Sequence, residues 1–339
     1  MITIADVAKR AGVSKMTVSR VINGSGYISQ ETRARVEQAI DELGYIPNTL
    51  ARSLRYKRTK TLGLILTDIT NPFFTTLARG VEDIASEHGF SVIFCNTDES
   101  PEEEERYVHV LTQKQVDGVL LVPTAGTPES IAFLENRSVP FVLLDRRVPD
   151  VYVDVVRCDS EQGAYDLVRH LLALGHKRIA ALGGSALITS STDRVAGYRR
   201  AMIEAGLERE TFRAHFTSFT IEGGYQGAQS ALRVDPRPTA LFATNNFIAI
   251  GAFRAVREAG LIIPDDLSLV SFDDMPPAVG IEPFLTIVEQ PAYEMGRRAT
   301  QVLMQRLDDG GPNRPQDIVL PTRLIIRSSS GPVVQSHEL

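Results

Sequence analysis

The stretch 3-TIADVAKRAGVSKMTVSRVIN-23 has the pattern of two short helices joined by a glycine turn. Thr3 is a suitable N-cap, and Asp6 three residues later completes the spacing of a capping box. Gly12 permits a tight turn, and Ser14 suits the N-cap of a second helix over residues 15–23. The apolar residues of the first helix share one face: Ile4, Val7, Ala8 and Ala11. This pattern predicts a helix-turn-helix, a unit whose second helix enters the major groove of DNA.

The second helix has one apolar and one polar face. The apolar face carries Val18, Val21 and Ile22, and the opposite face carries Lys15, Met16, Ser19 and Arg20. Arg20 can bind a guanine through two hydrogen bonds, Lys15 can do so less rigidly, and Met16 can contact a thymine methyl group. Thr17 and Ser19 are better suited to phosphate oxygens. A solvated helix of any helical domain is the alternative, but cap, turn and basic pair would then coincide by chance.

The charge of the chain is divided unevenly. Residues 1–60 carry 11 Lys and Arg against 5 Asp and Glu, whereas the whole chain carries 36 against 42. A basic head on an acidic body indicates that only the head meets a polyanion such as DNA.

A third helix is predicted from Ser29 to Leu43, with Gly44 ending it. Its buried stripe consists of Val36, Ile40 and Leu43. The segment 45-YIPNTLARSLR-55 follows and predicts a short helix over residues 49–56. So short a helix is not stable alone in water, so it needs DNA or a second copy of itself as a partner.

These motifs together resemble the lactose-repressor (LacI) family of bacterial transcription regulators, in particular its ribose- and purine-repressor branch. The resemblance extends over essentially the whole chain and thins in the last dozen residues. It implies a dimer that binds a palindromic operator with a central CG step. The implied operator contacts are Thr3, Ser14, Lys15, Met16, Thr17, Ser19, Arg20, Asn23, Asn48, Ala51, Arg52, Leu54 and Arg55.

The same resemblance makes the short segment a hinge helix that enters the minor groove. Leu54 matches the leucine that wedges into the central base step and kinks the duplex. Packing of Leu54 on the third helix is the alternative. Lys15 and Met16 depart from the small polar pair common in this branch and are more similar to gluconate-type members, which leaves the outer operator bases open.

Residues 61–339 alternate apolar runs with helical stretches. Strands are predicted at residues 61–66, 91–95, 118–122, 141–144, 179–182, 240–243 and 267–272. Helices are predicted at residues 75–88, 103–113, 161–174, 194–205, 225–232 and 248–259. Such alternation predicts doubly wound parallel sheets, in which ligands bind beyond the carboxyl ends of the strands.

Polar and aromatic side chains follow several of these predicted strands. The resemblance to periplasmic sugar-binding proteins of the ribose type rests on the motifs Asn71-Pro-Phe-Phe and Leu144-Asp-Arg. It implies effector contacts at Asn71, Phe73, Phe74, Asp145, Arg146, Arg194, Asn245, Asp273 and Gln290. Amides, carboxylates and guanidinium groups suit the hydroxyls of a sugar, and phenylalanine suits its apolar face. Strand-end Asp and Asn can instead be helix caps.

Two positions differ from that pattern. Asn246 replaces the usual acidic residue, and an additional Arg147 is either solvated or helps to hold a carboxylate. A neutral pentose or hexose is the first expectation for the effector, and a sugar acid is the second. A purine, or a phosphorylated protein co-repressor as in catabolite-control members, remains an alternative.

The resemblance also implies the domain organisation. We expect a DNA-binding domain over residues 1–47, a hinge over 48–60, and an effector-binding core over 61–339. Within the core, the first lobe covers about 61–159 and 291–321, and the second about 160–290 and 322–339. Lobe closure on the effector would be linked to operator binding, and in sugar sensors of the family the ligand usually releases DNA. The tail lacks heptad leucines, so a dimer rather than a tetramer is expected.

Other classes of protein fit the sequence less well. We find no GxGxxG, P-loop, nucleophile elbow or HExxH motif, and the six histidines lack metal-ligand spacing, so neither an enzyme, a cofactor nor a metal is expected. An exported binding protein would need a signal peptide, and none is recognised. Two cysteines form no disulfide framework, which fits a cytoplasmic protein without a membrane segment.

Overall fold

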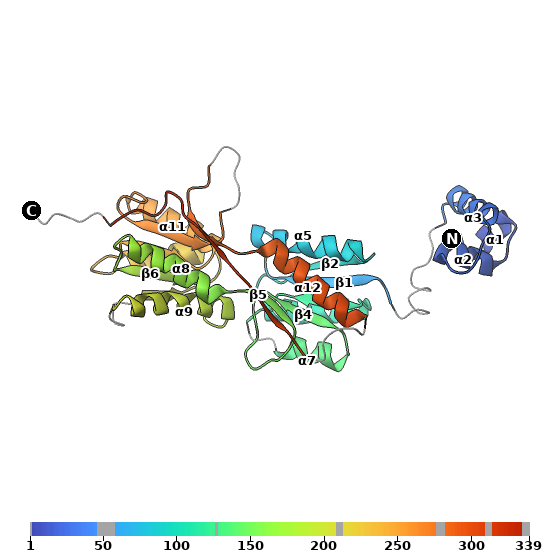
Figure 1. The fold of residues 1–339 in the computed structure, drawn as a ribbon, viewed down its shortest axis with the longest axis horizontal. Coiled ribbons are helices and arrows are strands. Elements are labelled where there is room, and N and C mark those ends of the chain that lie inside the picture. Colours follow the sequence, from blue (N-terminus) through green and yellow to red (C-terminus); the bar gives the residue numbers. More distant parts are fainter. Residues whose placement is uncertain are drawn as a thin grey trace, which may run out of the picture. The chain divides into compact units, whose positions relative to one another are not determined.

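The computed structural model describes residues 2–45, 58–125, 128–207, 213–275, 282–308 and 314–333. The chain forms two compact units, Met1–Thr59 and Lys60–Leu339 (Figure 1). The predicted hinge contacts lie outside the described residues and stay predictions: Asn48, Ala51, Arg52, Leu54 and Arg55.

The first unit contains the three predicted helices, α1 (Ile4–Ala11), α2 (Lys15–Asn23) and α3 (Gln30–Leu43). Each helix ends at a glycine in the left-handed region: Gly12 (φ 67°), Gly24 (φ 59°) and Gly44 (φ 59°). A small core joins the three helices, formed by Val7, Ala8, Ala11, Val18, Val21, Val36 and Ala39. The helix faces that were predicted from the sequence to be apolar therefore pack against one another in this core.

The first lobe of the second unit is built on a parallel sheet with the strand order β11-β5-β4-β3-β1-β2. Its strands are β1 (Thr61–Leu66), β2 (Ser91–Asn96), β3 (Gly118–Leu121), β4 (Phe141–Leu144), β5 (Val155–Cys158) and β11 (Asp317–Leu320). Its helices are α5 (Pro72–Glu87), α6 (Pro101–Gln113), α7 (Pro128–Asn136) and α12 (Ala292–Leu307).

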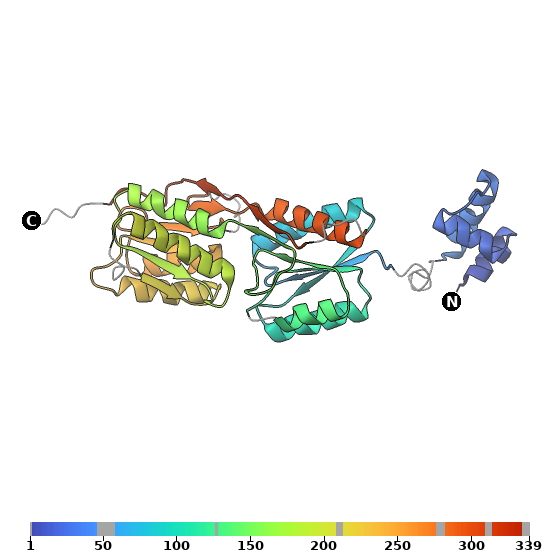
Figure 2. The same ribbon diagram turned by 60° about the horizontal axis from the view of Figure 1, so that its bottom comes forward.

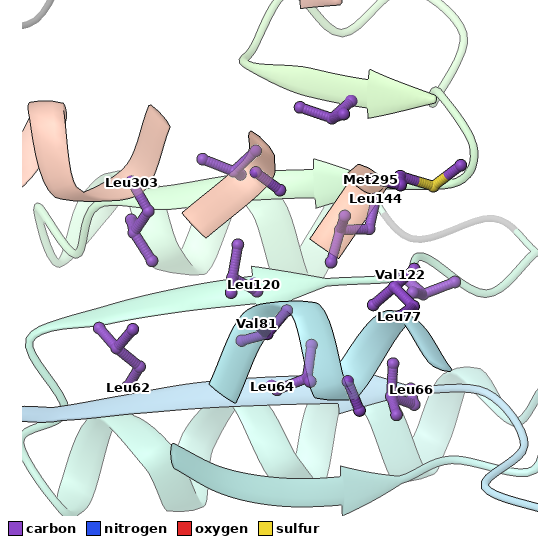
Figure 3. Close-up of a cluster of buried hydrophobic side chains, with 14 of the residues drawn as sticks. Leu62, Leu64, Leu66, Leu77, Val81, Leu120, Val122, Leu144, Met295 and Leu303 are labelled. Atoms are coloured by element: carbon purple, nitrogen blue, oxygen red, sulfur yellow. The ribbon is translucent and has the colours of Figure 1, made fainter. Parts of the chain in front are cut away.

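Side chains of β1 alternate between the two faces of this sheet. Leu62, Leu64 and Leu66 pack against α5 and α12, as Figure 3 shows, whereas Ile65 packs with side chains of α6 and α7. Strands that helices cover on both faces of the sheet consist of continuous runs of apolar residues. Such runs are easily recognised in the sequence.

The second lobe repeats this plan with the strand order β12-β10-β9-β8-β6-β7. Its strands are β6 (Ile179–Gly183), β7 (Arg213–Phe216), β8 (Ala240–Ala243), β9 (Ser268–Phe272), β10 (Thr286–Glu289) and β12 (Arg323–Ile325). Helices α8 (Ser160–Ala173) and α9 (Thr189–Glu204) cover one face, and α10 (Ile221–Leu232) and α11 (Asn246–Glu258) cover the other (Figure 2).

The chain passes between the two sheets at three places, after β5, after β10 and after β11. Only two residues separate Leu320 of β11 from Arg323 of β12. β12 therefore enters the second sheet from the edge where its parallel strands end, and it pairs antiparallel with β10. This is the one departure from the expected parallel pattern among the described strand pairs.

The seven predicted strands are present within one residue of their expected bounds, but five strands and two helices were missed: β5, β7, β10, β11, β12, α7 and α12. Five predicted helices also begin two to five residues too late: α5, α6, α9, α10 and α11.

Close helix packing explains one glycine-rich segment. A Cβ atom on Gly224 of α10 would lie 2.3 Å from the carbonyl oxygen of Ile248 in α11, whereas one on Gly227 would lie 3.4 Å from Thr217 Cγ2. Gly224 thus permits the crossing of the two helices, whereas Gly227 does not have to be glycine.

We expect Gly224→Ala to destabilise the core by about 1–3 kcal/mol, because an overlap with backbone forces the helices apart. Gly227→Ala, the matched control in the same helix, is expected to stabilise it by about 0.5–1 kcal/mol, because alanine loses less entropy in a helix. Calorimetric unfolding of both variants measures the effect. Equal unfolding temperatures for the two variants would contradict the close-packing argument.

Candidate functional site

The reading face of the head is formed by α2. Ser14 caps this helix, because its Oγ accepts a hydrogen bond of 3.1 Å from the backbone N–H of Thr17. Lys15, Met16 and Arg20 are exposed, with 64% of the surface of Met16 accessible. A large apolar side chain left in water beside two cations is the arrangement expected of a surface that contacts base edges and phosphates.

Thr3 and Asp6 fix the start of α1. Asp6 Oδ2 accepts the backbone N–H of Thr3 at 2.8 Å and its hydroxyl at 2.7 Å. These hydrogen bonds lower the pKa of Asp6. The remaining predicted head contacts, Thr17 and Ser19, are half-buried beside the exposed residues of α2, and Asn23 is the last residue of that helix.

A cavity of about 360 Å³ lies in the second unit, beyond the carboxyl ends of strands from both sheets. All nine predicted effector contacts line it: Asn71, Phe73, Phe74, Asp145, Arg146, Arg194, Asn245, Asp273 and Gln290. The structure thus brings together residues that are up to 219 positions apart in the sequence. Their role as effector contacts stays a prediction.

Two of these residues are helix caps as well. Asn71 Oδ1 accepts the N–H of Phe73 at the start of α5, and Asn245 Oδ1 accepts the N–H of Ile248 at the start of α11. Asn71 also joins the two lobes, because its side-chain amide exchanges two hydrogen bonds of 3.0 Å with that of Asn246. An ionised acidic residue at position 246 could accept from Asn71 but not donate to it, so the asparagine makes the second of these two hydrogen bonds possible.

Arg146 is the centre of a buried ionic cluster in the first lobe. Its Nη1 and Nη2 donate to Glu99 Oε2 and Oε1 at 2.9 and 3.0 Å, and its Nε donates to Asp145 Oδ2 at 3.2 Å. Burial opposes the charge of Arg146, but the two carboxylates outweigh it and raise the pKa of the guanidinium group. Asp145 Oδ1 is buried without a hydrogen-bond partner in the cavity wall. It is therefore a buried acceptor whose hydrogen-bonding capacity the protein leaves unused.

Arg194 anchors a second cluster in the other lobe. Its Nη1 donates to the carbonyl oxygen of Thr244 at 2.7 Å, and its Nη2 donates to Gln290 Oε1 at 2.9 Å. Gln290 Nε2 in turn donates to Asp273 Oδ2 at 2.6 Å, and Cys158 Sγ donates to Gln290 Oε1. Burial raises the pKa of the Cys158 thiol to about 11, so it stays protonated as a donor.

The aromatic part of the cavity comes from three phenylalanines. Phe73 and Phe74 meet edge to face with ring centroids 5.0 Å apart. Phe219, which follows β7, also lines the cavity and lies 5.9 Å from the guanidinium carbon of Arg146. Sequence reasoning missed Phe219 because β7 itself was not recognised.

A second link between the lobes lies at Arg147, which does not line the cavity. Its Nη2 donates to Asp193 Oδ1 at 2.9 Å, and Thr189 Oγ1 donates to its carbonyl oxygen at 2.8 Å. Arg147 thus pairs with a carboxylate of the protein, and the expectation that it helps to hold a carboxylate of the effector stays a prediction.

Family comparisons agree with this geometry. The model for bacterial regulatory proteins of the lacI family matches residues 3–48, and that for a periplasmic binding protein-like domain matches residues 168–330. The transcriptional regulator DegA of Bacillus subtilis is 39% identical over 98% of this chain and 98% of its own length. The ribose operon repressor of Halalkalibacterium halodurans is 39% identical over 97% of each chain. This chain belongs to the LacI family.

Solved structures of other LacI-family proteins share its fold. The lac repressor dimer bound to operator and the anti-inducer ONPF has a TM-score of 0.86 and 28% identity, covering 97% of this chain and 99% of the other. A LacI-family regulator from Enterococcus faecium with bound ribose has a TM-score of 0.73 and 33% identity, covering 81% of this chain and 100% of the other. Membership of the LacI family makes this protein a DNA-binding transcriptional regulator and not an enzyme.

Two further observations concern the described part of this LacI-family chain. None of its helices there combines the length and the apolar character needed to cross a membrane. No group of three or more His, Cys, Asp or Glu side chains there has the geometry to hold a metal ion.

Asp273 has the most perturbed carboxyl group of the cavity. Part of the side-chain surface of Asp273 is accessible from the cavity, so the residue is half-buried. Protein atoms nevertheless pack closely around its carboxyl group. Burial raises its pKa to about 6, although Arg194 and the hydrogen bonds from Gln290 act in the opposite direction. The protonated form is thus favoured in the folded protein relative to the unfolded chain, whose aspartates titrate near the ordinary value of 3.8.

The stability that Asp273 contributes is therefore fully present below about pH 4 and is lost as the pH rises through about 6. The asparagine of the Asp273→Asn variant cannot titrate. The free energy of unfolding of this variant, minus that of the wild type, should therefore rise by roughly 1–3 kcal/mol between pH 4 and 6.5 and then stay constant. Denaturant unfolding of both proteins across this range measures the difference. Parallel pH profiles would contradict a raised pKa.

Proposed function

We propose that this regulator binds a palindromic operator as a dimer and controls carbohydrate-utilisation genes in response to a neutral, ribose-like pentose or a hexose. The observation that carries the proposal is the cavity, which combines phenylalanine rings with an unpartnered buried acceptor, Asp145 Oδ1. Convergent polar groups beside aromatic rings in a concave wall are typical of small-molecule sites. The ribose operon repressor and the ribose-bound E. faecium structure among its relatives support a sugar.

The charges in the cavity favour a neutral sugar over a sugar acid. The lining includes five carboxylates against two guanidinium groups: Asp68, Asp98, Glu99, Asp145 and Asp273 against Arg146 and Arg194. Arg147, the cation that made a sugar acid plausible, is paired with Asp193 outside the lining. A carboxylate ligand would therefore meet more negative than positive charge.

The domain organisation belongs to the same proposal. We place the DNA-binding domain at residues 1–47, the hinge at 48–60, and the effector-binding core at 61–339, with lobe boundaries near residues 159, 290 and 321. Ligand binding between the lobes would favour their closed arrangement and, through the dimer, weaken operator binding. The relative crystallised as a dimer on its operator supports this arrangement.

Asp145→Asn should weaken sugar binding at least about tenfold, because a neutral amide replaces a buried charged acceptor. Asp150→Asn is the matched control: Asp150 has the same left-handed backbone (φ 60° against 67°) but is exposed outside the cavity. Titration calorimetry with D-ribose and D-glucose, with D-gluconate and hypoxanthine as comparison ligands, gives the affinities. Binding of only gluconate or hypoxanthine by the wild type would reject the proposed effector class, and an unaltered Asp145→Asn affinity would remove Asp145 from the site.

Arg20→Ala should cost about 1–3 kcal/mol in operator binding and relax the preference for one base pair, provided that Arg20 reads a guanine. Arg35→Ala removes the same charge from an exposed position on α3 and is the control. Selection of binding sites from randomised DNA, followed by anisotropy titrations on the selected site, measures both effects. Identical selected sequences for Arg20→Ala and the wild type would exclude base reading by Arg20.

A further inference from the structure

Glu99 was not recognised from the sequence, yet it forms an ion pair with one of the two guanidinium groups of the cavity wall. Both of its carboxylate oxygens accept from Arg146, at 2.9 and 3.0 Å. Arg146 is 5% exposed, whereas the side chain of Glu99 is 30% exposed. Glu99 thus reaches from the rim of the cavity and covers the two-nitrogen edge of a buried guanidinium group.

The hydrogen bonds of Arg146 are nearly exhausted by the protein. Besides the two to Glu99, Nη1 donates to the carbonyl oxygen of Pro123 at 3.1 Å and Nε donates to Asp145. A guanidinium group has five N–H donors, so a single one is left for a ligand. One donor suffices for a hydroxyl, but a carboxylate or phosphate is bound most strongly by two parallel donors.

The backbone around Glu99 holds it in this position. Asp98 and Glu99 are consecutive left-handed residues, with φ of 50° and 59°, which is uncommon for a glutamate. Asn96 fixes the loop, because its amide donates to Asp98 Oδ1 at 2.7 Å and its Oδ1 accepts the N–H of Ile69 at 2.8 Å. A residue kept in a sparsely populated conformation is commonly found where function requires it.

We propose that Glu99 is a specificity residue: by occupying both terminal nitrogens of Arg146, it withholds this guanidinium group from anionic ligands and makes the cavity select neutral sugars. The inference rests on the proposed function, because it concerns the discrimination between sugars in the same cavity. It assigns to one side chain a part in excluding sugar acids and sugar phosphates that goes beyond the overall charge of the site.

The test uses the full-length protein with Glu99→Gln and, as the matched control, Asp98→Asn. Asp98 lines the same cavity on the same loop, and its substitution removes the same charge, but its carboxylate accepts a hydrogen bond from Asn96 and not from Arg146. Glu99→Asn is a second variant, because asparagine tolerates the left-handed region and is too short to cover Arg146. Calorimetric unfolding shows whether each variant is folded.

Titration calorimetry with D-ribose and D-ribonate, and with D-glucose and D-gluconate, gives the ratio of the affinity for the anion to that for the neutral sugar. We expect this ratio to rise at least about tenfold in both Glu99 variants and less than about threefold in Asp98→Asn. An unchanged ratio in the folded Glu99 variants, or an equal rise in Asp98→Asn, would overturn the role of Glu99 while leaving the sugar-binding function intact. A wild type that binds neither neutral sugar would overturn the proposed function and this inference together.

Discussion

The fold of the second unit depends on one constraint: parallel strands end together, so whatever follows them must share one edge of the sheet. β1 and β8 are each followed there by a helix whose first N–H groups need acceptors. Asn71 and Asn245 supply them and at the same time line the cavity. Because two such edges face each other, residues that begin helices in separate lobes become one polar cavity. The same side chains thus cap helices and line the cavity.

The two arginines of the cavity are held in different ways. Arg146 is enclosed by carboxylates of its own lobe, whereas Arg194 binds a carbonyl oxygen and the amide of Gln290, and only that amide connects it with Asp273. A guanidinium group fixed by its neighbours before a ligand arrives loses little conformational freedom on binding. The cavity therefore presents a preorganised set of donors and acceptors in which acceptors are in excess, the complement of a molecule rich in hydroxyl groups.

The position of a residue in the fold could be predicted from the sequence where a single interaction determines it. It could not be predicted where several interactions determine it together. Apolar runs such as Phe141–Leu144 and the caps of the head helices were predictable, because burial on two faces and cap chemistry leave direct patterns. β7, β11 and β12 are short and half-exposed and carry no such pattern, so Phe219 was missed with β7. Nothing in the spacing of Glu99 indicates its partner, since a left-handed loop turns it toward a residue 47 positions away.

Two of the links between the lobes differ in their response to the solution around them. The amide pair of Asn71 and Asn246 is buried and uncharged, whereas Arg147 and Asp193 form an ion pair with 42% and 18% of their side-chain surfaces exposed. Dissolved ions screen an exposed pair but hardly affect a buried amide. Raising the ionic strength should consequently weaken the link between Arg147 and Asp193 more than the link between Asn71 and Asn246.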